Sequence, residues 1–150
     1  MAINPNTNFT AGAVLTAAQQ NRFPRGVMAY ATKNTNTTMS TVTDVGLSVT
    51  FTAVANRYYK YTFFSYATNS SAASTNNFFL TDGTNNTLAT SNVYVVGGAA
   101  YTLVHFPTVR TETAGSVTRK IRCSTSNGTG TVYADATNVM FLLVEDIGPA

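Results

Sequence analysis

The stretch Leu47-Ser48-Val49-Thr50-Phe51-Thr52-Ala53 alternates apolar and hydroxyl side chains. Successive side chains of a β-strand point to opposite faces of the sheet, so this spacing predicts a strand with one buried and one wet face. The following stretch, residues 57–66, carries aromatic rings at both alternating sets of positions. One set is Tyr59, Tyr61 and Phe63, and the other is Tyr58, Lys60, Thr62, Phe64 and Tyr66. We expect one set to meet the core and the other to meet something else.

Further strand patterns surround these two, with turn signals roughly every 8–12 residues, a spacing typical of an all-β sandwich or barrel. The expected strands include residues 78–80, 92–96, 100–110, 117–123, 131–135 and 139–144. Asp82-Gly83 predicts a tight hairpin turn, because both residues tolerate positive φ. Pro107 lacks a backbone N–H and is expected to interrupt its strand. The predicted fold is a two-layer antiparallel β-sandwich, jelly-roll-like in connectivity.

The N-terminal residues follow a different pattern, and we divide the chain into an arm over residues 1–26 and a sandwich domain over residues 27–150. Pro5 argues against a regular strand in the first ten residues. Residues 15–21 are the one helical stretch, with Thr16 as its cap, and Phe23-Pro24 ends it. We expect the apolar side chains of the arm to bind a partner subunit. They are Ile3, Phe9, Val14, Leu15 and Phe23.

The composition of the 150 residues narrows the class of protein. Charged residues make up 10%, while Thr, Asn and Ser together number 52, so the surface is built from uncharged hydrogen-bonding groups. The 17 Phe and Tyr residues need an apolar environment, which argues against disorder. The first ten residues are polar and the apolar runs are four to six residues long, far below the roughly 20 of a membrane helix. We expect synthesis in a cytosol without membrane insertion.

The net charge of +3 is too small to indicate nucleic-acid binding, which needs a wide basic face. The one basic cluster, Arg119, Lys120 and Arg122, lies on a strand pattern and divides between its two faces. We interpret it as a solvated or edge strand protected by charge. Cys123 cannot form an internal disulfide and is predicted to be a small core side chain.

Residues suited to catalysis are few, so we predict no enzyme activity, no cofactor and no metal site. His105 is the one imidazole, without a nucleophile or orienting carboxylate near it in sequence. Glu145-Asp146 is the one adjacent acidic pair; we place it after the last strand, as a chain-end or subunit contact. A hydrolase is a third hypothesis, behind a structural protein and a binding module.

Four tyrosines form a candidate face for a subunit or a ligand: Tyr58, Tyr66, Tyr94 and Tyr101. Tyrosine is common at surfaces where its ring is shielded from water and its hydroxyl contacts water. Sugar binding and subunit packing both use such surfaces, and both remain open.

Two segments carry a family resemblance. Phe9-Thr10-Ala11-Gly12-Ala13-Val14-Leu15-Thr16-Ala17-Ala18-Gln19-Gln20-Asn21 resembles a segment that introduces a β-rich domain in phage tail-fibre and minor tail proteins. The ending Phe141-Leu142-Leu143-Val144-Glu145-Asp146-Ile147-Gly148-Pro149 resembles the last strand of small structural proteins of tailed phages. The sequence of residues 49–59 and 80–83 also resembles that of these phage proteins in general character.

This resemblance implies a virion protein assembled in the host cytoplasm: a minor tail, fibre-type or capsid decoration protein displayed on the particle exterior. It implies a homo-oligomer, a trimer, that also contacts other capsid or tail subunits. The alternative function is a glycan-binding module that recognises a host receptor.

Overall fold

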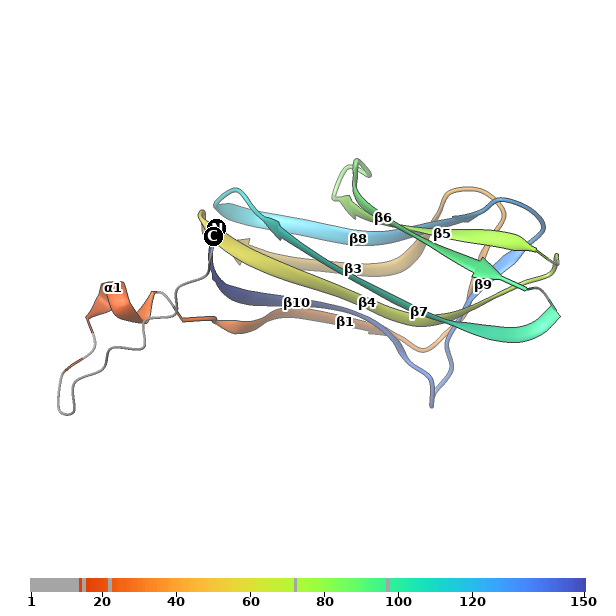
Figure 1. Cartoon of the computed structure of the whole chain (residues 1–150), viewed down its shortest axis with the longest axis horizontal. Helices are drawn as coiled ribbons and strands as arrows, with labels where there is room; N and C mark the ends of the chain where they lie inside the picture. Colours follow the sequence, from red (N-terminus) through yellow and green to blue (C-terminus); the bar gives the residue numbers. More distant parts are fainter. Residues whose placement is uncertain (1–13, 15, 22, 72, 97) are drawn as a thin grey trace.

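The computed structural model describes residues 14, 16–21, 23–71, 73–96 and 98–150. Within these residues the regular elements are one short helix and otherwise strands. In chain order they are α1 (Ala17–Gln20), β1 (Gly26–Lys33), β2 (Thr37–Met39), β3 (Thr43–Ala53), β4 (Arg57–Asn69), β5 (Ser74–Asp82), β6 (Thr87–Val95), β7 (Gly98–Thr111), β8 (Gly115–Thr125), β9 (Gly130–Tyr133) and β10 (Met140–Pro149). The strands form two antiparallel sheets that pack face to face (Figure 1), so the two-layer sandwich is confirmed.

The first sheet has β4 at its centre. β7 pairs with β4 along residues 58–69 on one side. On the other side β10 pairs with residues 57–64 and β9 with residues 66–69. β9 and β10 therefore lie in one line beside β4, interrupted by a loop over residues 134–139. β1 extends the sheet beyond β10, and β2 extends it beyond β9.

The second sheet has the order β3-β8-β5-β6. We count β1 and β2 as one interrupted strand, and β9 and β10 as another, which leaves eight strands. The first of these pairs with the last (β1/β2 with β9/β10), the second with the seventh (β3 with β8), the third with the sixth (β4 with β7) and the fourth with the fifth (β5 with β6). This pairing arises when one long antiparallel hairpin of four strand pairs folds over into two sheets. It is the strand order of a jelly roll.

The core lies between the two sheets and contains the rings that alternation assigns to one face of β4. One set was expected to meet the core, and it is Tyr59, Tyr61 and Phe63, which are buried and pack against Phe51 of β3 and Phe78 of β5. Each buried aromatic ring removes about 150–250 Å² from water, so these side chains dominate the stability of the domain.

Three strand predictions are wrong in their details. β7 continues through Pro107, because β7 is an edge strand with one neighbour and its outer side needs no N–H. β8 lies between β3 and β5 rather than at an edge, and its Arg119 side chain is buried. The last strand extends to Pro149, so Glu145 and Asp146 lie within β10 rather than after it.

The β5–β6 hairpin is confirmed, although its turn differs from the expected one. The residue with positive φ is Asn85, at 73°, rather than Gly83. Asp82 accepts hydrogen bonds from the backbone N–H groups of Thr84 and Asn86 and from their side chains. The hydrogen bonds, that from the Asn86 side chain first, lower the pKa of Asp82 to about 2.

Cys123 is fully buried in the core, as predicted. Burial raises the pKa of its thiol to about 12, because the thiolate would have to form away from water. The thiolate is the reactive form, so the native protein should react with Ellman's reagent at pH 8 only through unfolding. We expect full labelling in denaturant and slow labelling, at the unfolding rate, without it. Rapid labelling of the native protein would contradict the burial of this strand.

Candidate functional site: the outer face of the first sheet and the root of the N-terminal segment

We use N-terminal segment for the described residues from Val14 to Pro24. Arg57 of the sandwich holds this segment by hydrogen bonds. Arg57, at the start of β4, is buried and forms an ion pair with buried Asp146 of β10, its Nη2 lying 2.8 Å from Oδ1. The same guanidinium donates to the backbone carbonyls of Asn21 and Phe23, just beyond α1. Carbonyls at a helix end have no partner within the helix, and a cationic side chain can satisfy them. Arg57 therefore links the two terminal regions of the chain.

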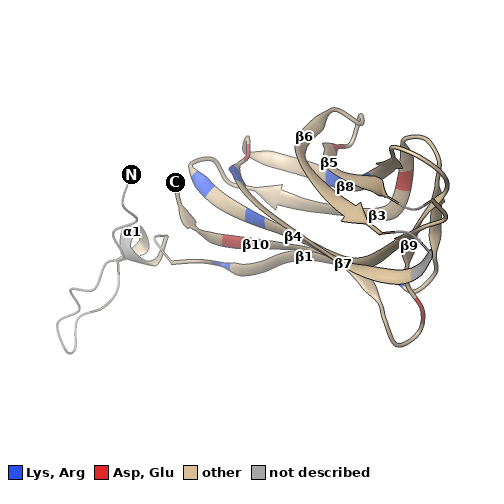
Figure 2. Cartoon of the chain, turned by 45° about the vertical axis from the view of Figure 1, so that its right-hand side comes forward, with Lys and Arg blue, Asp and Glu red and all other residues tan. Residues whose placement is uncertain are grey.

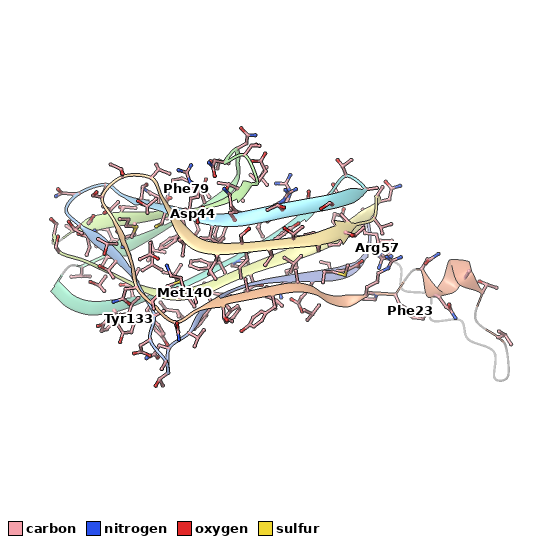
Figure 3. The ribbon with its side chains drawn as sticks, turned by 180° about the vertical axis from the view of Figure 1, so that it is seen from behind. Phe23, Asp44, Arg57, Phe79, Tyr133 and Met140 are labelled. Atoms are coloured by element: carbon pink, nitrogen blue, oxygen red, sulfur yellow. The ribbon has the colours of Figure 1, made fainter. Side chains whose placement is uncertain are left out.

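Figures 1 and 3 show the result of this link in the overall arrangement. Figure 3 places Phe23 and Arg57 at the same end of the sandwich, next to α1. α1 lies beyond the end of the sheets and covers neither of them (Figure 1). The N-terminal segment thus leaves the domain at one end, away from the faces of the sheets.

The predicted arm residues are in part outside this description. Ile3, Phe9 and Leu15 lie outside the described residues. Val14 is 90% exposed, and the Phe23 side chain is also exposed. Neither of these two side chains is buried against the sandwich domain.

A second feature is the outer face of the β1-β10-β4-β7 sheet. The register places Phe64 of β4 beside Phe141 of β10 and His105 of β7, and Leu143 beside Tyr30 of β1. We call this surface the aromatic face. Its apolar members are Val27, Tyr30, Phe64, Leu103, Pro107, Val109, Phe141 and Leu143.

Ring contacts run across three strands of the aromatic face. Tyr30 contacts Phe141 with centroids 5.8 Å apart, and Phe141 stacks on Phe64 at 5.3 Å with an angle of 11°. Phe64 in turn meets Tyr66 edge-on at 5.8 Å. Offset and edge-on pairs at these separations are favourable, so the rings hold each other in a continuous band.

The band ends in a shallow cleft of about 170 Å³ that we call the tyrosine cleft. It is lined by Tyr66, Tyr101, Tyr133 and Asn138. The rings of Tyr101 and Tyr133 lie 4.6 Å apart. Figure 3 shows Tyr133 at the end of the sandwich opposite Arg57. The cleft and the root of the N-terminal segment therefore lie at opposite ends of the domain.

Asp135 fixes one wall of the tyrosine cleft. Its carboxylate accepts hydrogen bonds from the Tyr133 hydroxyl, from the backbone N–H groups of Asn138 and Thr137, and from the Asn138 side chain. The hydrogen bond from Tyr133 is the largest cause that lowers the pKa of Asp135, to about 2. The same contact raises the pKa of Tyr133. Both side chains are thus held in place at neutral pH.

The four predicted tyrosines do not form one face. Tyr66 and Tyr101 meet in the tyrosine cleft. Tyr58 lies near the opposite end of β4, and Tyr94 lies on the second sheet. Sequence analysis missed Tyr133 and Asn138. Tyr133 is brought to Tyr66 by the β4–β9 pairing, and alternation within one strand carries no information on pairing between strands.

All six carboxylates of the chain have partners within the fold. Glu112 is buried beside Arg119 and Arg110 and accepts a hydrogen bond from the Tyr61 hydroxyl. Burial, with this hydrogen bond, raises the pKa of Tyr61. The other carboxylates are Asp44 and Glu145, paired with lysines, Asp82 and Asp135 in turns, and Asp146 with Arg57. Of the two contacts expected for Asp146, the chain-end contact agrees with the structure and the subunit contact does not, because its partner is the buried Arg57 of the same chain.

Two further classes of site can be assessed on the described part of the chain. It contains no group of three or more His, Cys, Asp or Glu side chains able to hold a metal ion. None of the helices described there is long and apolar enough to cross a membrane. His105 is exposed on β7, in register with Phe64.

Comparison with known proteins supplies a fold and no family. No protein-family model and no curated protein sequence matches the chain. Among solved structures it is similar to Eiger TNF from S. frugiperda, at 12% identity with a TM-score of 0.53, covering 84% of this chain and 96% of that one. At this identity the likeness shows a shared fold alone.

Two viral structures are similar at lower TM-scores. The VP2 subviral particle of infectious bursal disease virus is 12% identical, with a TM-score of 0.38, and covers 84% of this chain. The enzymatically active domain of tailspike protein 4 of bacteriophage CBA120 is 15% identical, with a TM-score of 0.34, and covers 76% of this chain. The chain spans 38% and 19% of their respective lengths.

The ion pair at the root of the N-terminal segment predicts how substitutions there will act. Arg57→Met leaves the buried Asp146 carboxylate without its cation and should lower the free energy of unfolding by about 3–5 kcal/mol. The double variant, Arg57→Met with Asp146→Asn, should lower the free energy of unfolding by less, because neither of its two side chains is charged. Urea unfolding followed by circular dichroism measures both. A double variant less stable than the single one would show that charge burial is not the cause.

Proposed function

We propose that this chain is a non-enzymatic structural protein of a bacteriophage virion. Its sandwich is displayed on the particle exterior, as a minor tail, fibre-type or capsid decoration protein, and its arm with the short helix α1 is the anchor. The sequence resemblance of residues 9–21 and 141–149 to tailed-phage proteins supports this proposal. The observation that carries it is the root at Arg57, from which the N-terminal segment leaves the end of the sandwich.

The energetics of an arm explain why it needs a partner. Ordering an extended segment costs roughly 1–2 kcal/mol per residue, which burial of apolar side chains must offset. Val14 and Phe23 are exposed on the chain by itself. Together with Ile3, Phe9 and Leu15 they supply the apolar side chains that a capsid or tail subunit would bury. The sequence resemblance implies that copies of the chain also associate, as trimers.

Deleting residues 1–22 tests the anchor. The deletion keeps every strand that the structure describes and both partners of the Arg57–Asp146 pair, and of the contacts of Arg57 it removes that with Asn21, so the truncated protein should remain folded and soluble. It should no longer join particles when it replaces the full chain during assembly. Protein content of purified particles, measured by quantitative mass spectrometry, gives the readout, and a thermal unfolding curve provides the control for folding. Normal incorporation of the folded, truncated chain would refute the arm as anchor.

A second candidate function is recognition of a host-surface glycan at the tyrosine cleft. Three tyrosine rings and an asparagine side chain combine apolar surfaces for a sugar ring with polar groups at its edge. The volume of about 170 Å³ is smaller than the roughly 300–1,000 Å³ of pockets for drug-sized ligands. The cleft would therefore hold a single terminal sugar rather than a long chain.

A glycan array with the purified chain tests this candidate, with Tyr101→Ala as the site variant. Tyr101 lines the cleft, whereas Tyr94, on the other sheet, has a similar exposure. Tyr94→Ala is therefore a matched control. If the cleft binds sugar, reproducible array signals should disappear in Tyr101→Ala and persist in Tyr94→Ala. An array without signals, or equal loss in both variants, would remove this function.

A further inference from the structure

The outer faces of the two sheets differ in chemistry. On the second sheet, the outward side chains of β3 and β8 include Ser48, Thr50, Thr118, Lys120 and Arg122, all polar. On the first sheet, the aromatic face exposes Val27, Tyr30, Leu103 and Val109, each by 51–62%. Phe79 of β5 and Tyr94 of β6 also point outward on the second sheet, but the register gives them polar neighbours, Thr90 and Arg122 for Phe79 and Thr75 for Tyr94. The apolar side chains of the aromatic face instead adjoin one another across four strands.

The size of the aromatic face suits an interface between proteins. Eight apolar side chains from four strands make up this face, and four of them are more than half exposed, an extent comparable with the largest apolar patch of a typical monomer, about 300–600 Å². Each partner of a standard interface contributes about 800 Å², of which the core is apolar and the rim polar. The aromatic face therefore has the dimensions of an interface core.

The electrostatics of the aromatic face favour an identical partner. Among the described outward positions of β1, β10, β4 and β7, the charged side chains are Lys60 and Glu145. They pair with each other at 3.3 Å within one chain. Figure 2 shows the charged segments of β4 and β10 in the half of these strands nearest α1. A face whose charges cancel can meet its own copy without like-charge repulsion.

The edge strands of this sheet disfavour association of two copies by pairing of one edge strand with another. Pro107 lies within the edge strand β7 and removes a backbone donor. Lys33, on the edge strand β1, points inward and donates to Thr37 and to the carbonyl of Val45. Proline and inward-pointing charge both oppose the addition of a further strand. Association is therefore expected face to face rather than edge to edge.

We propose that the aromatic face is the surface through which a second copy of this chain binds, forming a homo-oligomer with the tyrosine cleft at the rim of the interface. The proposal deepens the self-association in the proposed function and names its surface. It does not depend on the arm, because the aromatic face contains no residue before Val27.

Two tyrosines allow a matched test. Tyr30, on the aromatic face, is 57% exposed, and Tyr94, on the outer face of the second sheet, is 60% exposed. Both lie on strands at the edge of their sheets. A carboxylate at position 30 also removes the ring contact of Tyr30 with Phe141, so the fold of this variant is checked separately. In the oligomer that carboxylate would be buried in the interface without a partner, whereas at position 94 it would stay in water.

The experiment measures molar mass by sedimentation velocity from about 1 to 100 µM, a range that covers micromolar dissociation constants. The full chain should associate, and Tyr30→Asp and Val109→Asp should each weaken association by about tenfold or more. Tyr94→Asp should associate like the unmodified chain. Near-ultraviolet circular dichroism identifies a variant that has lost its fold. If either Tyr30→Asp or Val109→Asp is unfolded, the other one tests the proposal.

Two results would overturn the proposal. One is an unmodified chain that stays monomeric at the highest concentration, which would leave the aromatic face to a different partner. The other is an association that Tyr94→Asp weakens as much as the face variants do. The chain without residues 1–22 should still associate, so a failure of the anchor and a failure of the aromatic face give different results.

Discussion

The alternation of side chains along β4 is the constraint on which the rest of the structure depends. A strand at the centre of a sheet must place neighbouring side chains on opposite faces, and β4 carries aromatic rings on both. The second sheet covers Tyr59, Tyr61 and Phe63 and completes the core. Phe64 and Tyr66 are left on the outside, where they meet rings from β9 and β10 and form the aromatic face and the tyrosine cleft. Core and candidate site are thus two sides of one strand.

The two ends of β4 belong to different surface features. At its start, Arg57 joins β10 and the N-terminal segment, so the direction in which the arm leaves depends on an ion pair between residues far apart in sequence. Near its other end, Tyr66 lines the tyrosine cleft. The proposed anchor and the proposed recognition surface thus lie at opposite ends of one strand, which is paired on both of its sides.

Sequence patterns predicted those features that are local. Alternation identified strands such as β3, β4 and β8 and placed Tyr59, Tyr61 and Phe63 together on one face of β4, and Cys123 was recognised as a core side chain. Features that depend on strand pairing could not be predicted. The partnership of Arg57 with Asp146, the burial of Arg119 against Glu112 and the meeting of Tyr66 with Tyr133 all join different strands. Pro107 was misjudged for the same reason, since its effect depends on whether β7 has one neighbour or two.

The interruption between β9 and β10 has a consequence for how this fold can vary. Both strands stay in line beside β4, and the loop over residues 134–139 leaves and rejoins that line without displacing either pairing. Residues in this loop, Asp135 and Asn138 among them, shape the tyrosine cleft. Insertions in this loop would change the shape of the tyrosine cleft while β9 and β10 keep their register with β4.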